Sequence, residues 1–108
     1  MKTRIASATL ASLLFAVSAA TPIYAATAPE LLKKNACMAC HSIDKKVLGP
    51  AFKEIAKKYK GNAEAITVLS KKVKDGGSGV WGPVPMPAQN GKVNDADIKT
   101  MVEHILSQ

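Results

Sequence analysis

Two cysteines and one histidine stand together in the pentapeptide Cys37-Met38-Ala39-Cys40-His41, and the chain contains no other cysteine. In a short helical turn, residues i, i+3 and i+4 lie on one face. Two thiols on such a face can reach the two vinyl groups at one edge of a porphyrin, while the imidazole ligates the iron from one side. The spacing therefore predicts one haem c, attached through two thioethers to Cys37 and Cys40, with His41 as an axial ligand.

The same pentapeptide has three simpler interpretations. A zinc site would need further Cys or His ligands at matching spacing, and His104 is the only other histidine. A thioredoxin-like redox pair would lie in a βαβ unit, and the sequence shows no convincing strand pattern. A disulfide between Cys37 and Cys40 is the third alternative, because oxidising compartments favour disulfides.

Met86 is surrounded in the sequence by Pro83, Pro85 and Pro87. Each proline fixes φ and removes a backbone donor, so this stretch excludes a helix and stiffens the chain. A thioether held in this way suits the sixth coordination position of a haem iron, where methionine raises the reduction potential. If Met86 does not ligate, the alternative is a haem protein with an open sixth position that binds gases or catalyses a reaction.

The start of the chain has the layout of a secretory signal peptide. Lys2 and Arg4 give a cationic start, residues 5–20 are uncharged and largely apolar, and small residues follow around Ala25. A membrane span needs about 20 mostly apolar residues, and this run is shorter and diluted by Ser, Thr and Ala, which argues against an uncleaved anchor. We predict a cleaved signal peptide over residues 1–25, with cleavage after Ala20 as the competing site.

The mature chain, residues 26–108, is expected to form one small domain without a membrane anchor. A chain of this size has a marginal hydrophobic core. A buried porphyrin would supply the centre of that core, and covalent attachment would keep it in place. We therefore expect the haem-free chain to be largely unfolded.

The mature domain is expected to be all-α, with four helices and no strands. The first helix begins near Pro29, with Thr27 as its cap, and leads into the haem motif. The second covers residues 52–59, where apolar residues recur at helical spacing.

The third and fourth predicted helices are marked by their ends. Asn62 caps the third, which the two glycines at 76–77 terminate. Asn94 caps the fourth, and Asp97 three residues later resembles the second member of a capping box.

Several motifs together resemble the small class I bacterial cytochromes c of the c-551 type. The resemblance spans residues 26–108 and implies an all-α fold of about four helices around one covalently bound haem. It also implies a soluble periplasmic carrier of single electrons rather than an enzyme, with axial ligation by His41 and Met86. The motifs are, in order, CMACH, Leu48-Gly49-Pro50-Ala51-Phe52, Gly79-Val80-Trp81-Gly82 and Pro85-Met86-Pro87.

The resemblance also implies roles for residues around the iron. The carbonyl of Pro50 would accept the Nδ1 proton of His41, and Trp81 would bond a haem propionate with Lys72 nearby. Family members often place Asn three residues after the ligand methionine, next to its sulfur. This chain has Gln89 there, followed by Asn90, and we expect a longer turn.

Charge indicates the kind of partner. The chain carries 15 Lys and Arg against 8 Asp and Glu, a balance of 13 against 8 without Lys2 and Arg4. No basic run with interleaved aromatics points to nucleic acid. The resemblance implies redox partners, a periplasmic reductase, peroxidase or oxidase and a membrane donor complex. Lysines around the haem edge would steer docking with them; the candidates are Lys33, Lys34, Lys45, Lys46 and Lys92.

Overall fold

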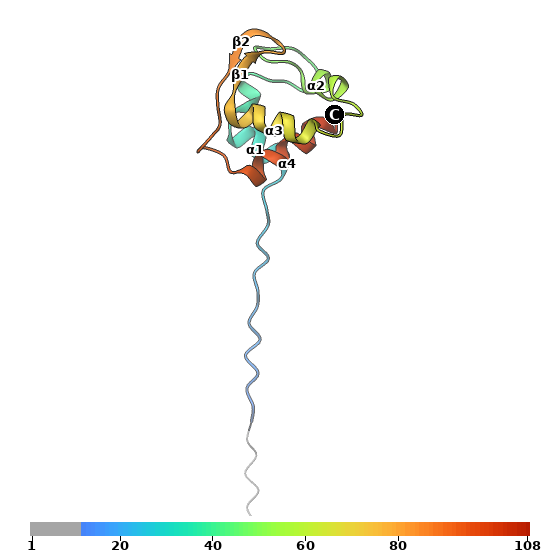
Figure 1. Ribbon diagram of the computed structural model, residues 1–108. Coiled ribbons are helices and arrows are strands. Elements are labelled where there is room, and N and C mark those ends of the chain that lie inside the picture. Colours follow the sequence, from blue (N-terminus) through green and yellow to red (C-terminus); the bar gives the residue numbers. More distant parts are fainter. Residues whose placement is uncertain (1–11) are drawn as a thin grey trace, which may run out of the picture.

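A computed structural model describes residues 12–108 of the chain (Figure 1). In this range four α-helices, one short 3-10 helix and one two-stranded antiparallel ribbon follow one another. The elements are α1 (Ala28–Lys34), η1 (Cys37–Ala39), α2 (Phe52–Lys58), α3 (Ala65–Asp75), β1 (Gly77–Gly79), β2 (Gly82–Met86) and α4 (Asp95–Leu106). The mostly helical fold confirms the predicted class.

Helix α4 is the centre of the packing, because it contacts each of α1, α2 and α3. Its apolar stripe meets residues from the other three helices, and Phe52, Ile98 and Val102 are the largest fully buried side chains. The ribbon of β1 and β2 lies to one side of these helices (Figure 1). The remaining core residues are Leu31, Leu32, Ile55, Leu69, Val93, Met101 and Ile105.

Helix α1 is capped by Thr27, as the sequence predicts. The Glu30 carboxylate accepts hydrogen bonds from the Thr27 N–H at 2.8 Å and from its hydroxyl at 2.9 Å. The helix ends at Lys34, however, because Ala36 adopts a left-handed φ of 56°. The expectation of a continuous helix into the haem motif is therefore wrong, and the motif begins on the separate turn η1.

The helix ends differ in how well they match the sequence. At α4 the Asn94 side chain accepts from the Asp97 N–H at 2.8 Å, as predicted. At α3 the helix begins at Ala65, whereas Asn62 accepts from the Glu64 N–H at 2.8 Å. Asn62 therefore forms a local turn before the helix rather than its cap, since asparagine bonds its own backbone two residues on.

The ribbon corrects the expectation that the domain has no strands. β1 pairs with β2, placing Gly77 opposite Met86 and Gly79 opposite Gly82, with an irregularity between the pairs. Glycine and proline have low strand propensity, so neither strand is visible as an alternating pattern. Prolines are tolerated because β2 pairs on one side only within the described residues, and its other edge needs no donors.

Residues 12–27 precede α1 without a helix or strand and extend away from the domain (Figure 1). Their large apolar side chains are exposed, among them Leu14 at 96% and Phe15 at 89%. The start of the predicted signal peptide, residues 1–11, lies outside the described residues. Among the residues described, no helix is both long and apolar enough to cross a membrane.

Candidate functional site

A cavity of about 370 Å³ opens between η1, the ribbon and helices α2, α3 and α4. Most of its walls are apolar, which suits a largely hydrophobic ligand. The sequence-predicted residues Cys37, Cys40, His41 and Met86 all line it, as do Pro50, Lys72 and Trp81. Residues separated by more than half of residues 26–108 are thus brought to one site.

The His41 ring is fixed on three sides. Its Nδ1 lies 2.8 Å from the Pro50 carbonyl oxygen, so the protonated Nδ1 donates to that carbonyl. The ring stacks on Phe52 with centroids 5.3 Å apart, and Phe52 is only 2% exposed. A side chain at Gly49 would meet the imidazole, because an added Cβ would lie 2.5 Å from its Cε1. Nδ1 is occupied in this way, so Nε2 is the nitrogen available to a metal.

Both cysteines are half-buried free thiols. Burial raises the pKa of the Cys37 thiol, and the nearby Cys40 adds to the shift. The Cys37 thiol also lies 3.9 Å from the Asn35 carbonyl oxygen, which it can reach as a weak donor. Both cysteines therefore line an apolar cavity as free thiols, available for two thioether attachments.

The alternative zinc site finds no ligand set here. Among residues 12–108, no group of three or more His, Cys, Asp and Glu side chains is arranged to hold a metal ion. The donor set at the cavity is instead two thiols, one imidazole with a fixed tautomer and one thioether. Those four groups fit a covalently attached haem, which needs two sulfur attachments and one or two axial ligands.

Met86 reaches the cavity from the end of β2. It is half-buried and lies opposite Gly77 in the ribbon. Beyond it the chain turns back onto α3, where the N–H groups of Gln89 and Asn90 donate to the carbonyls of Val73 at 3.1 Å and Lys74 at 3.0 Å. The segment that carries Met86 is therefore attached to β1 at Gly77 and to the end of α3 through Gln89 and Asn90.

Comparison with known sequences decides the family. The sequence model for Cytochrome c matches residues 25–108. The chain belongs to the cytochrome c family. It is 51% identical over 78 residues to cytochrome c-552 of Hydrogenobacter thermophilus, covering 72% of this chain and 78% of that protein. It is 47% identical over 81 residues to cytochrome c-551 of Pseudomonas aeruginosa, covering 74% and 76%.

Solved structures agree with this assignment. Cytochrome c552 of Nitrosomonas europaea is 51% identical and superposes with a TM-score of 0.69, over 73% of this chain and 96% of that one. The protein is thus a small class I monohaem cytochrome c, whose cofactor is one covalently attached haem c. Members of this family act as electron carriers.

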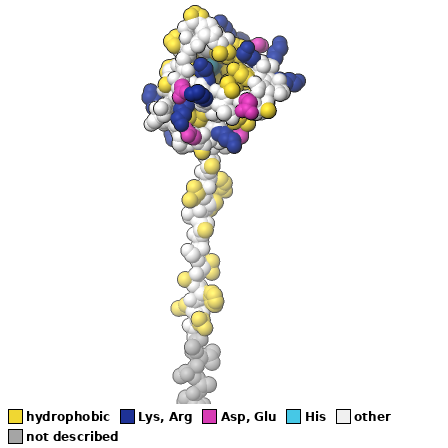
Figure 2. All heavy atoms as spheres, viewed as in Figure 1, with side chains coloured by type: hydrophobic (Ala, Val, Ile, Leu, Met, Phe, Trp, Pro, Cys, Tyr) yellow, Lys and Arg dark blue, Asp and Glu magenta, His cyan; other side chains and the backbone are white. Residues whose placement is uncertain are grey.

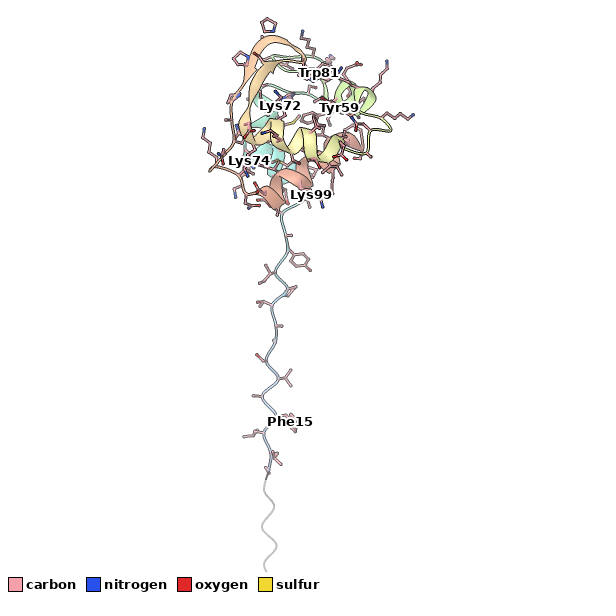
Figure 3. All side chains as sticks on the ribbon, viewed as in Figure 1. Phe15, Tyr59, Lys72, Lys74, Trp81 and Lys99 are labelled. Atoms are coloured by element: carbon pink, nitrogen blue, oxygen red, sulfur yellow. The ribbon has the colours of Figure 1, made fainter. Side chains whose placement is uncertain are left out.

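Trp81 and Lys72 lie at the rim of the cavity in this cytochrome. Figure 3 shows Trp81 beside the ribbon and Lys72 on α3. Trp81 is 39% exposed, and the Lys58 ammonium lies 5.6 Å from the centre of its ring, in range for a cation–π contact. Lys72 Nζ is 3.4 Å from the Gly76 carbonyl oxygen. Lys58 was not among the residues predicted from the sequence, because its contact with Trp81 spans 23 residues and leaves no local pattern.

The side chains of Gln89 and Asn90 do not line the cavity of the cytochrome. The Gln89 amide donates to the Pro87 carbonyl at 3.2 Å, and Asn90 is exposed. Both residues instead bond to α3 through their main-chain N–H groups. The structure therefore brings neither amide to the Met86 sulfur.

The five candidate docking lysines are all exposed on the cytochrome. Lys33 and Lys34 end α1, just before Cys37, and Lys45 and Lys46 lie shortly before the cavity residue Leu48. Lys92 follows the turn after Met86. On the face shown in Figure 2, basic side chains are spread out and mixed with acidic ones rather than gathered in one run.

Proposed function

We propose that this cytochrome is a periplasmic carrier of single electrons, with haem c attached to Cys37 and Cys40 and ligated axially by His41 and Met86. The observation that carries the proposal is that an imidazole with a fixed tautomer and a proline-flanked thioether line one apolar cavity. The haem, when bound, supplies the one-electron couple of its iron. With His41 and Met86 both on the iron, no axial position would remain for a substrate, so we infer that the protein is not an enzyme.

The chain's own residues hold the two ligands in place. The Pro50 carbonyl keeps the proton on His41 Nδ1 and leaves the lone pair of Nε2 free to ligate the iron. Phe52 stacks on the His41 ring and so limits its rotation. On the other ligand, the ribbon and the turn at Gln89 and Asn90 limit the movement of Met86. Filling both axial positions excludes other ligands from the iron.

Two donors at the rim suit the anionic propionates of a haem. The Trp81 indole N–H and the Lys72 ammonium both belong to cavity-lining residues. An ammonium beside a carboxylate makes a charge-assisted hydrogen bond, which is stronger than a neutral one. Lys58 over the Trp81 ring would steady the indole in that role.

Residues 1–25 are proposed to direct export and to be removed. The Cytochrome c match begins at residue 25, beside the proposed cleavage site after Ala25. The described part of this segment packs on nothing, since Leu13, Leu14 and Phe15 are each at least 85% exposed. Its removal would therefore leave the core intact, and the mature protein would be free of a membrane anchor in the periplasm.

Docking is proposed to occur at the cavity rim. Leu48, Val80 and Val84 line the cavity yet are each more than half exposed, so apolar surface surrounds its opening. Lys33, Lys34, Lys45, Lys46 and Lys92 would steer acidic redox proteins towards it. The proposed partners are a periplasmic reductase, peroxidase or oxidase and a membrane donor complex.

Absorption spectroscopy of the purified holoprotein tests the ligation. We expect a low-spin haem c spectrum, a thioether-to-ferric-iron charge-transfer band, and no response of the reduced protein to carbon monoxide. Met86→Ala should remove the band, admit carbon monoxide and lower the potential, because methionine ligation raises it. Rapid carbon monoxide binding by the unaltered protein would instead indicate an open sixth position and a gas-binding or catalytic role.

A further inference from the structure

Gly76 ends α3 in a conformation that side chains rarely adopt. Its φ is 68° and its ψ is −154°, a region of backbone space that is essentially restricted to glycine. The residue is also buried, and its N–H donates to the Lys72 carbonyl oxygen at 2.7 Å. The chain reverses here from the helix into β1.

The backbone of the Met86 segment packs directly on Gly76. A Cβ added there would lie 2.5 Å from the Met86 carbonyl oxygen, 2.7 Å from the Ala88 nitrogen and 3.0 Å from the Ala88 Cα. All three are backbone atoms, so no side-chain rotation can relieve the contact. A residue larger than glycine would push the Met86 segment away from the end of α3.

The attachments on either side of this contact carry Met86 with them. Met86 pairs with Gly77, the next residue after Gly76. Gln89 and Asn90 then bond the Val73 and Lys74 carbonyls, which the end of the helix leaves without intrahelical partners. The main chain from Met86 to Asn90 is therefore attached to β1 at Gly77 and to α3 through Gln89 and Asn90, and the backbone of Met86 and Ala88 lies close against Gly76.

We propose that Gly76 is a positioning residue for the Met86 sulfur: its missing side chain lets the Met86 segment dock on α3 and so sets where the thioether stands in the cavity. The inference rests on the proposed axial ligation by Met86. Gly61 is the matched contrast, because it also has a positive φ, 77°, but an added Cβ there meets nothing within 4 Å.

The test compares Gly76→Ala with Gly61→Ala in the ferric holoprotein, using the rate at which added imidazole replaces the methionine. Both variants carry backbone strain, but only Gly76→Ala displaces the Met86 segment. We expect imidazole to bind at least about tenfold faster in Gly76→Ala than in Gly61→Ala, because a displaced Met86 segment holds the thioether on the iron less tightly. The charge-transfer band of Gly76→Ala should be weakened for the same reason. Equal rates and equal bands in the two variants would overturn the proposal.

A second measurement on the unaltered holoprotein covers the case in which Gly76→Ala does not fold. Amide hydrogen exchange of Gln89 and Asn90 reports opening of the junction with α3, and imidazole binding reports departure of Met86. If the junction positions the sulfur, the two opening rates coincide. Exchange much faster than imidazole binding would show that the junction opens while Met86 stays, contradicting the proposal.

The two proposals fail in different ways. If the unaltered protein lacks the charge-transfer band and binds carbon monoxide, axial ligation by Met86 is wrong, and the role of Gly76 falls with it. If the band is present but Gly76→Ala behaves as Gly61→Ala does, ligation stands and only the positioning role is lost.

Discussion

The Nδ1 atom of His41 lies 2.8 Å from the carbonyl oxygen of Pro50, nine residues further along the chain. Gly49 comes just before that proline, and its Cα faces the imidazole ring so closely that no Cβ would fit. Pro50 therefore orients the imidazole through its carbonyl, and the neighbouring Gly49 closes off the space beside the ring. A small loop segment sets both the tautomer and the tilt of the ring.

Gly49→Ala should displace the His41 ring, because its Cβ would lie 2.5 Å from Cε1. Overpacking of this kind costs about 1–3 kcal/mol in free energy of unfolding. We expect a lower denaturation midpoint and a shifted NMR resonance for the Nδ1 proton. Gly61→Ala is the control for the resonance, because its added Cβ meets nothing within 4 Å. An unmoved Nδ1 resonance in Gly49→Ala would contradict the prediction.

Removal of the haem should largely unfold the domain. In the double variant Cys37→Ala/Cys40→Ala, purified free of haem, nothing would fill the cavity of about 370 Å³, and its apolar walls would meet water. Far-UV circular dichroism should show mostly unfolded chain at room temperature. Ala39→Ser, which keeps both cysteines, is the control. A cooperative thermal transition of the double variant near that of the holoprotein would refute the expectation.

Ile98→Ala should destabilise the fold without altering the iron. Ile98 is 1% exposed and does not line the haem cavity. Truncating a buried isoleucine costs about 2–5 kcal/mol in free energy of unfolding, which denaturant titration measures. Val68→Ala, at a side chain 45% exposed, is the control and should change stability by less than about 0.5 kcal/mol. A loss of the charge-transfer band in Ile98→Ala would count against this separation of roles.

Lysines near the cavity should govern reactions with anions. Oxidation of the reduced holoprotein by ferricyanide should slow as salt is added, and the double variant Lys45→Gln/Lys46→Gln should react several-fold more slowly at low salt. Lys99→Gln/Lys60→Gln makes the same charge change at exposed positions on α4 and just after α2. If both pairs of substitutions slow the reaction equally, total charge rather than its placement sets the rate.

The Glu30 carboxylate should make the stability of α1 depend on pH. Its hydrogen bonds with Thr27 hold its pKa below the usual range. A depressed pKa in the folded state contributes stability above the unfolded value, about 4.3, and that contribution is lost as the pH falls through the folded value. The difference in melting temperature between the unaltered protein and Glu30→Gln should therefore shrink in acid.

Glu54→Gln provides the control for this pH effect. Glu54 lies in the first turn of α2, so the substitution removes the same charge from a helix start. Its carboxylate makes none of the side-chain hydrogen bonds found among residues 12–108. A pH dependence as large for Glu54→Gln as for Glu30→Gln would show that helix-dipole effects, rather than the Thr27 bonds, are responsible.

Features that depend on neighbours along the chain could be predicted from residue types and their order. The Cys37–His41 spacing, the Thr27 and Asn94 caps and the apolar stripe of α4 each join residues within about one helical turn, so their types and order suffice to predict them. The c-551-type motifs added the family, which the comparisons then confirmed. The glycines after α3 were correctly predicted to end the helix.

Contacts between residues far apart in the sequence became visible only in the folded chain. Glycines and prolines hide β1 and β2 from any strand pattern, and pairing alone brings Gly77 opposite Met86. The same holds for Lys58 over Trp81 and for the contact between Gly76 and the Met86 backbone. Such contacts depend on where distant segments meet in the packed chain. The residues next to Gly76 or Lys58 in the sequence therefore do not indicate which residue each one contacts.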